Sequence, residues 1–178
     1  MHTSLQHLAE LKTKGRKILF PDSIKIMVGA ASCGLAAGAE TVFNALLAGV
    51  KKRGLQAVVT KTGCVGICHQ EPIVDISMPG KGRFVYGQVT PDSVSSLLDA
   101  LEKNVLPSGA LFRLSREESL LDGSVKRYPS MHGKSKKQAV PILSAISFYK
   151  KQYRIALRNC GLIDPENIME YVALGGYR

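Results

Sequence analysis

The feature that most constrains the fold is an apolar run, a helical pattern and a second apolar run between residues 24 and 61. Residues 24–29 (IKIMVG) are short and apolar, which predicts a buried strand. Residues 39–53 have the apolar periodicity of a helix, and Gly54 is suited to end it. Residues 57–61 (AVVTK) predict a second strand. This order predicts two parallel strands joined by a helix.

The next forty residues complete a small α/β domain. Residues 73–78 and 83–88 predict two strands, and the glycine-rich residues 79–82 between them suit a hairpin turn. Thr90 is the expected N-cap of a helix that continues through Leu101. The element order β-α-β-β-α predicts a thioredoxin-like fold, with a four-stranded mixed sheet and flanking helices.

Outside this core the pattern is weaker. A leading helix is expected over residues 4–15, and the Ser-, Gly-, Pro- and Lys-rich residues 106–140 predict a basic linker with one short helix around 116–121. A short strand over residues 154–158 and a helix capped by Asp164 are expected to form a C-terminal strand-helix element.

Charge and segment composition limit the function classes. The formal net charge is +10 over 178 residues, but no groove-binding motif or aromatic interleaving accompanies the basic stretches. A docking surface for an acidic partner protein is therefore favoured over nucleic-acid binding. No apolar stretch is long enough to cross a membrane, and the first residues lack the apolar segment of a secretory signal, so a cytoplasmic location is expected.

Three of the four cysteines lie in loops that follow predicted strands. Cys33 follows the first strand, and Cys64 and Cys68 follow the second. Because parallel strands end at the same edge of a sheet, the three thiols are expected to converge. Gly63 and Gly66 would let backbone N–H groups approach the sulfurs. Such a group of thiolates is suited to iron.

The residues alone leave other interpretations open. Cys33 could be a small buried residue, with Cys64 and Cys68 forming an idle or redox-labile dithiol. Zinc bound with His69 as the fourth ligand is less favoured, because Cys68 and His69 are adjacent. A thioredoxin-type oxidoreductase is disfavoured too, since it would have two residues between its cysteines at a helix N-terminus.

Several segments resemble a known family. The segments IMVGAASCGLAAGAETVFNAL, KTGCVGICHQEP and YGQVTPDSV are similar to the thioredoxin-like [2Fe-2S] ferredoxin domain of complex I-like NADH dehydrogenases, NAD-linked hydrogenases and formate dehydrogenases. The tail FYKKQYRIALRNCGLIDPENIMEYVALGGYR resembles the start of the flavin-bearing, NADH-binding subunit. The resemblance implies a division into a helix, a ferredoxin domain, a linker and the start of a flavin-subunit domain: residues 1–20, 21–105, 106–147 and 148–178.

The resemblance also implies an electron relay. Cys33, Cys64 and Cys68 match three cluster ligands of the family, while Val28 occupies the position of the fourth. The glycine-rich loop that binds FMN and NADH is not in the sequence, so the chain alone is not expected to oxidise NADH. The expected function is an electron-transfer domain of an NADH-linked oxidoreductase complex, with ferredoxin-like and hydrogenase or dehydrogenase subunits as partners. The alternative is a cluster-free docking module of the same complex, and Cys160 is expected to be a structural cysteine.

Overall fold

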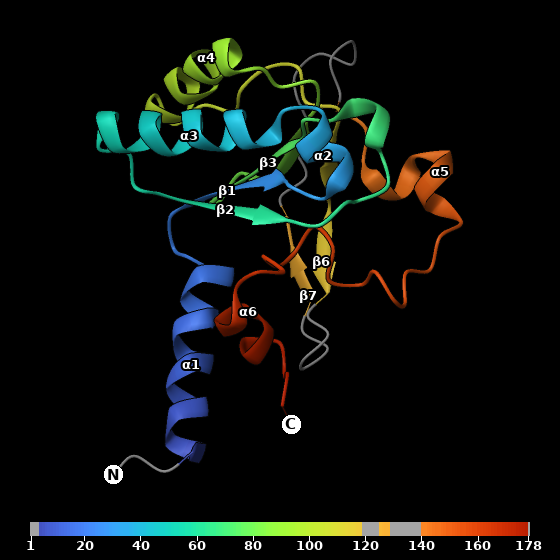
Figure 1. The fold of residues 1–178 in the computed structure, drawn as a ribbon. Coiled ribbons are helices and arrows are strands. Elements are labelled where there is room, and N and C mark those ends of the chain that lie inside the picture. Colours follow the sequence, from blue (N-terminus) through green and yellow to red (C-terminus); the bar gives the residue numbers. More distant parts are fainter. Residues whose placement is uncertain (1–3, 119–124, 129–139, 178) are drawn as a thin grey trace.

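A five-stranded mixed sheet forms the centre of the molecule (Figure 1). The computed structural model describes residues 4–118, 125–128 and 140–177. The elements of the first hundred residues are α1 Ser4–Leu19, β1 Ile24–Gly29, α2 Ser32–Ala36, α3 Ala39–Arg53, β2 Ala57–Thr62, the 3₁₀ helix η1 Cys68–Gln70, β3 Val74–Met78, β4 Gly82–Tyr86 and α4 Pro91–Glu102. The remaining elements are β5 Phe112–Leu114, β6 Arg116–Glu118, β7 Val125–Arg127, the 3₁₀ helix η3 Leu143–Ala145, α5 Ser147–Lys150 and α6 Ile168–Ala173.

The strand order is β2-β1-β3-β4-β5. β1 and β2 are parallel, with Ile24 opposite Ala57, and β3, β4 and β5 each pair antiparallel with the preceding strand in this order. The four predicted strands are therefore present, and the predicted thioredoxin-like arrangement is confirmed. The fifth strand, β5, was not predicted, because three residues between Ser- and Gly-containing turns give almost no periodic signal.

One face of the sheet is covered by α3 and α4 (Figure 1). Alternate strand residues point to this face and pack with the apolar sides of the two helices, as the two-residue period of a strand requires. Thr90 caps α4 by accepting a hydrogen bond from the Ser93 backbone N–H, as predicted. The hydrophobic cluster between sheet and helices includes Ile26, Val28, Val42, Leu46, Val74, Ile76, Phe84, Tyr86, Leu97, Leu98 and Leu101.

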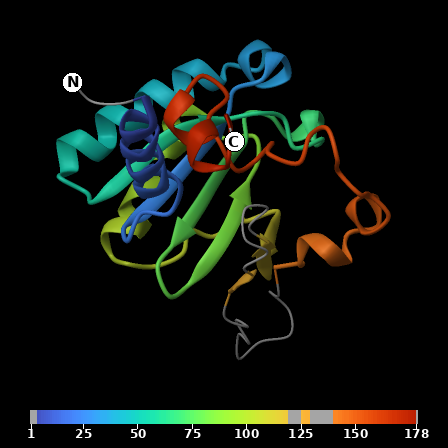
Figure 2. The same ribbon diagram turned by 90° about the horizontal axis from the view of Figure 1, so that it is seen from below.

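The opposite face carries buried polar side chains. Lys25, Asp75 and Arg83 are each at most 6% exposed. Figure 2 shows α1 and α6 in front of this face, together with the segment that leads into α6. Arg83 donates hydrogen bonds to both carboxylate oxygens of Asp75 and to the carbonyl of Gly161. The segment that leads into α6, called the C-terminal segment below, is thus attached to the sheet by polar contacts.

Two predictions near the N-terminus were wrong. The leading helix does not end at Gly15 but continues to Leu19, because Gly15 is a packing position: a Cβ there would lie 1.9 Å from the Met169 carbonyl oxygen of α6. Cys33, expected in a loop after the first strand, lies in the short helix α2, which packs against α3.

Three predictions in the second half were also wrong. Residues 116–118 form strand β6 and not a helix, because pairing with β7 outweighs their local helix propensity; residues 119–121 lie outside the described part. Residues 154–158 form turns and irregular backbone in place of the expected C-terminal strand. Helix α6 is capped by Asn167, whose side chain accepts from the Met169 backbone N–H, and not by Asp164.

Within the described part of the chain, none of the helices combines the length and the apolar character that a membrane span requires.

Candidate metal centre

The sulfurs of Cys33, Cys64 and Cys68 converge at one end of the sheet. All three lie within 4.8 Å of one another, and the Cys64 and Cys68 sulfurs are 3.5 Å apart. Cys68 is exposed, while Cys33 and Cys64 are half-buried. The predicted convergence is therefore confirmed.

Parallel pairing of β1 with β2 produces this convergence. Gly29, the last residue of β1, lies opposite Thr62, the last residue of β2, so the chain leaves both strands at the same edge. Cys33 then falls in the first turn of α2. This short helix lies so close to the strand end that only glycine fits at position 34. A Cβ there would lie 2.1 Å from the Gly29 carbonyl oxygen.

The loop after β2 presents the other two thiols. Gly66 has a φ of +94°, a conformation that favours glycine, and its backbone N–H donates a hydrogen bond to the Cys64 sulfur at 3.3 Å. The prediction of an amide directed at sulfur is confirmed for Gly66. Gly63 has a different part: a Cβ there would lie 3.0 Å from the Cys160 sulfur, so this glycine leaves space for the Cys160 side chain.

A buried carboxylate completes the surroundings of Cys33. The Cys33 thiol donates to Oε1 of Glu71 at 3.8 Å, and the Ile73 backbone N–H donates to Oε2 at 2.8 Å. Glu71 is 8% exposed. Sequence reasoning missed this residue, although it lies only three positions after Cys68, within the same quoted motif.

Burial and crowding raise the pKa values of these acidic groups. Burial, helped by the neighbouring Cys64 and Cys68 thiols and the Glu71 carboxyl, raises the pKa of Cys33 to about 12. Burial also raises the pKa of Cys64, although the Gly66 N–H opposes the shift. Without a cation, the first two thiols are therefore held in the protonated form at neutral pH. A metal ion would favour the thiolates and release these protons.

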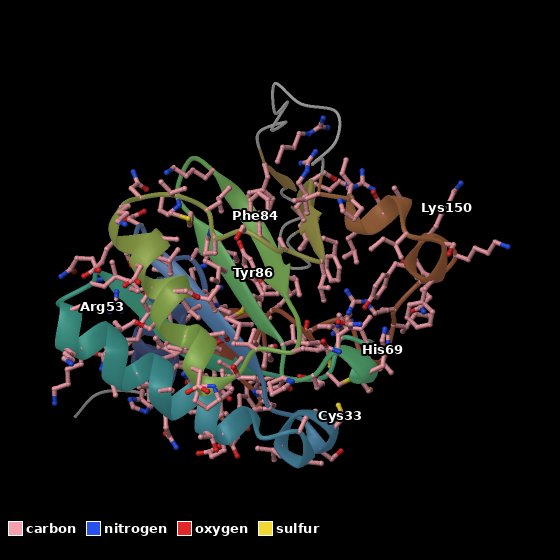
Figure 3. All side chains as sticks on the ribbon, turned by 90° about the horizontal axis from the view of Figure 1, so that it is seen from above. Cys33, Arg53, His69, Phe84, Tyr86 and Lys150 are labelled. Carbon is pink, nitrogen blue, oxygen red and sulfur yellow. The ribbon has the colours of Figure 1, made fainter. Side chains whose placement is uncertain are left out.

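The other residues singled out from the sequence lie outside the group of three sulfurs. His69 is exposed on η1, and Figure 3 shows it at the same end of the molecule as Cys33. Among the described residues, the compact group of possible metal ligands contains the three cysteines and neither His69 nor Glu71. Val28 is fully buried in the apolar core against α3 and α4. Cys160 is half-buried beside Gly63.

A cleft of about 330 Å³ lies on the polar face of the sheet, next to this site. Its lining includes Glu71, Arg83, Tyr149 and Cys160, but none of the three converging cysteines. The thiols therefore lie outside this cleft, and Cys68 is open to the approach of another molecule.

Two curated proteins are similar to parts of the chain. No family model matches the chain. Subunit HndB of the NADP-reducing hydrogenase of Solidesulfovibrio fructosivorans is 30% identical over 102 residues, which cover 54% of this chain and 81% of HndB. Subunit HndC from the same organism is 60% identical over 35 residues, which cover 20% of this chain and 7% of HndC.

Solved structures are also similar. One structure of a thioredoxin-like [2Fe-2S] ferredoxin from Aquifex aeolicus is 20% identical with a TM-score of 0.44, covering 51% of this chain and 92% of the ferredoxin. A second structure, of the wild-type ferredoxin, is 22% identical with a TM-score of 0.41, covering 48% and 91% of the two chains.

Proposed function

Because this chain belongs to the family of the NADP-reducing hydrogenase subunit HndB, we propose that it is an electron-transfer iron–sulfur domain of a multi-subunit, NAD(P)-linked hydrogenase-type complex. The observation that carries the proposal is the convergence of three thiols within 4.8 Å at the edge of a thioredoxin-like sheet. Soft sulfur donors in a small pocket are the ligands that iron–sulfur clusters use.

In this proposal Cys33, Cys64 and Cys68 are ligands of a [2Fe-2S] cluster. Such a cluster, when bound, accepts and releases one electron at a time. The loops supply what the cluster needs from the protein: three thiolates at a common point, and the Gly66 N–H, which stabilises negative charge on the Cys64 sulfur. The exposure of Cys68 opens the site to a docked electron donor or acceptor.

The proposed partners are the other subunits of the complex. The 35-residue stretch that is 60% identical to HndC supports a subunit of that kind as a partner. Since these residues span only 7% of HndC, the activity of HndC is not transferred to this chain. Residues 148–178, which resemble the start of a flavin subunit, are proposed to reflect this association with a flavin-type subunit. We also propose a cytoplasmic location.

Anaerobic reconstitution tests the function. The protein is incubated with iron and sulfide, desalted, and analysed for both elements, and the reduced form is examined by EPR. We expect two irons and two sulfides per chain and an EPR signal of a reduced [2Fe-2S] cluster. Cys33→Ser, Cys64→Ser and Cys68→Ser should each lose most of the cluster. Cys160→Ser is the matched control and should keep it, since its thiol lies outside the group of three sulfurs.

Two results would overturn the proposal. A colourless, iron-free protein after anaerobic reconstitution favours the alternative, a cluster-free docking module, which is motivated by Val28 at the position of the family's fourth ligand. If Val28→Cys forms a cluster and wild type does not, that alternative is strengthened. Zinc bound without sulfide would assign the thiols to a structural metal site.

A further inference from the structure

We propose that Glu71 supplies the fourth ligand of the cluster through its carboxylate, in place of the thiolate that the family pattern has at Val28. The inference rests on the proposed function, because it names the ligand that the three cysteines leave open. Val28 itself is fully buried among the apolar residues that pack against α3 and α4, so its side chain belongs to the core.

The distances group the candidate ligands into two pairs. The Cys64 and Cys68 sulfurs are 3.5 Å apart, and the Cys33 sulfur is 3.8 Å from Oε1 of Glu71. Two ligands on one tetrahedral metal, with bonds of about 2.0–2.3 Å, lie roughly 3.3–3.8 Å apart. Each pair therefore has the separation that two ligands of one iron require. A [2Fe-2S] cluster needs two such pairs.

The charge of Glu71 also requires an explanation. Its carboxylate is buried, and no ion pair among the described residues involves it. A buried carboxylate without a cation is costly, and proteins normally pair it or use it to bind a metal. An iron beside Cys33 would supply the missing positive charge.

The backbone holds this carboxylate in place. Cβ atoms on Gly29 and Gly34 would lie 2.9 Å and 3.2 Å from Oε2, so the two glycines leave the space that the carboxylate occupies. The Ile73 N–H binds Oε2, which leaves Oε1 directed at the Cys33 sulfur. A purely structural role for Glu71, as an acceptor for the Ile73 N–H, would need only an amide oxygen. Glutamine could then replace it.

This difference defines the experiment. Wild type, Glu71→Gln, Glu71→Cys and the control Glu166→Gln, an exposed site, are reconstituted anaerobically with iron and sulfide. Iron and sulfide content, cluster lifetime in the presence of EDTA, the EPR spectrum and the Mössbauer spectrum are measured. Circular dichroism and thermal unfolding of the metal-free proteins show whether each variant is folded.

We expect the Glu71→Gln cluster to be lost in EDTA at least about ten times faster than the wild-type cluster, with the metal-free fold unchanged. Glu166→Gln should match wild type. Glu71→Cys should retain a cluster with a changed EPR spectrum, and its two irons should become similar in the Mössbauer spectrum. The wild-type irons should differ, because only one of them binds oxygen.

The outcomes separate this inference from the proposed function. If wild type forms a cluster and Glu71→Gln forms the same cluster with the same lifetime and spectra, Glu71 is not a ligand, while the proposed function stands. Two equivalent irons in wild type would also overturn the ligand role. If wild type forms no cluster, the proposed function fails and the ligand role of Glu71 fails with it.

Discussion

The two faces of the sheet are stabilised in different ways. The face beneath α3 and α4 carries the main hydrophobic cluster, and its strand residues alternate with those of the other face. The face beneath α1, α6 and the C-terminal segment buries Lys25, Asp75 and Arg83. The first face is closed by non-directional hydrophobic burial. The second combines two smaller apolar clusters with the buried Asp75–Arg83 ion pair and with directional hydrogen bonds to the C-terminal segment.

This difference predicts how well each face tolerates amino-acid substitutions. An apolar core tolerates changes of shape at a moderate cost, whereas a buried ion pair is sensitive to the loss of either partner. The polar face also carries the attachments of the C-terminal segment: Gly161 donates to Thr62, and Thr62 donates to the Ile163 carbonyl. These contacts tie the segment to β2, next to the loop that presents Cys64.

The largest effect is expected at the buried ion pair. Asp75→Ala should lower the free energy of unfolding by about 3–5 kcal/mol, because it leaves the Arg83 guanidinium buried without its carboxylate. Urea denaturation followed by circular dichroism measures the change. The double variant Asp75→Leu with Arg83→Met should recover most of this loss. A change below about 1 kcal/mol in Asp75→Ala would show that the pair is not buried.

On the apolar face, Leu46→Ala should cost about 3 kcal/mol, within the usual range for a large-to-small core substitution. Leu46 is fully buried in the cluster between α3 and the sheet. Its neighbour Leu47 is 41% exposed on the same helix and provides the control. Leu47→Ala should change the free energy of unfolding by no more than about 0.5 kcal/mol. Equal effects for the two variants would contradict the assignment of helix faces.

The sequence predicted the apolar face well because its signals are local. The periodicity of residues 39–53, the stop at Gly54 and the Thr90 cap each act within a few residues, and all three are present in the structure. The convergence of Cys33, Cys64 and Cys68 was also predictable, since it follows from the parallel pairing of β1 and β2.

The polar face could not be predicted in this way. The partner of Arg83 at Gly161 is 78 residues away, and Glu71 contacts Cys33 across 38 residues. No local pattern indicates that Lys25 is buried or that Gly15 is a contact point for α6. The fifth strand and β6 depend on pairing with other strands, which outweighs weak or opposite local propensities.

A smaller, pH-dependent effect is expected at Lys25. Burial lowers the pKa of this amine to about 8, below its value of about 10.4 in an unfolded chain. Between these two pH values the unfolded chain binds more protons, so the contribution of Lys25 to stability increases as pH rises. The free energy of unfolding of wild type minus that of Lys25→Met should rise by about 2 kcal/mol between pH 7 and pH 9.5. Lys52→Met, an exposed site, should show no such trend.

The smallest effect is expected where α1 meets α6. A Cβ on Gly15 would lie 1.9 Å from the Met169 carbonyl oxygen, so Gly15→Ala forces the two helices apart. Alanine is the better helix former by roughly 0.5–1 kcal/mol, which offsets part of the about 1–3 kcal/mol that overpacking costs. We therefore expect a net loss of about 1 kcal/mol, with faster hydrogen exchange in α6. Exposed Lys14→Ala is the control and should leave α6 unchanged. If Gly15→Ala instead raises the free energy of unfolding, helix propensity dominates at this position. The close packing of α1 on α6 would then not contribute to stability.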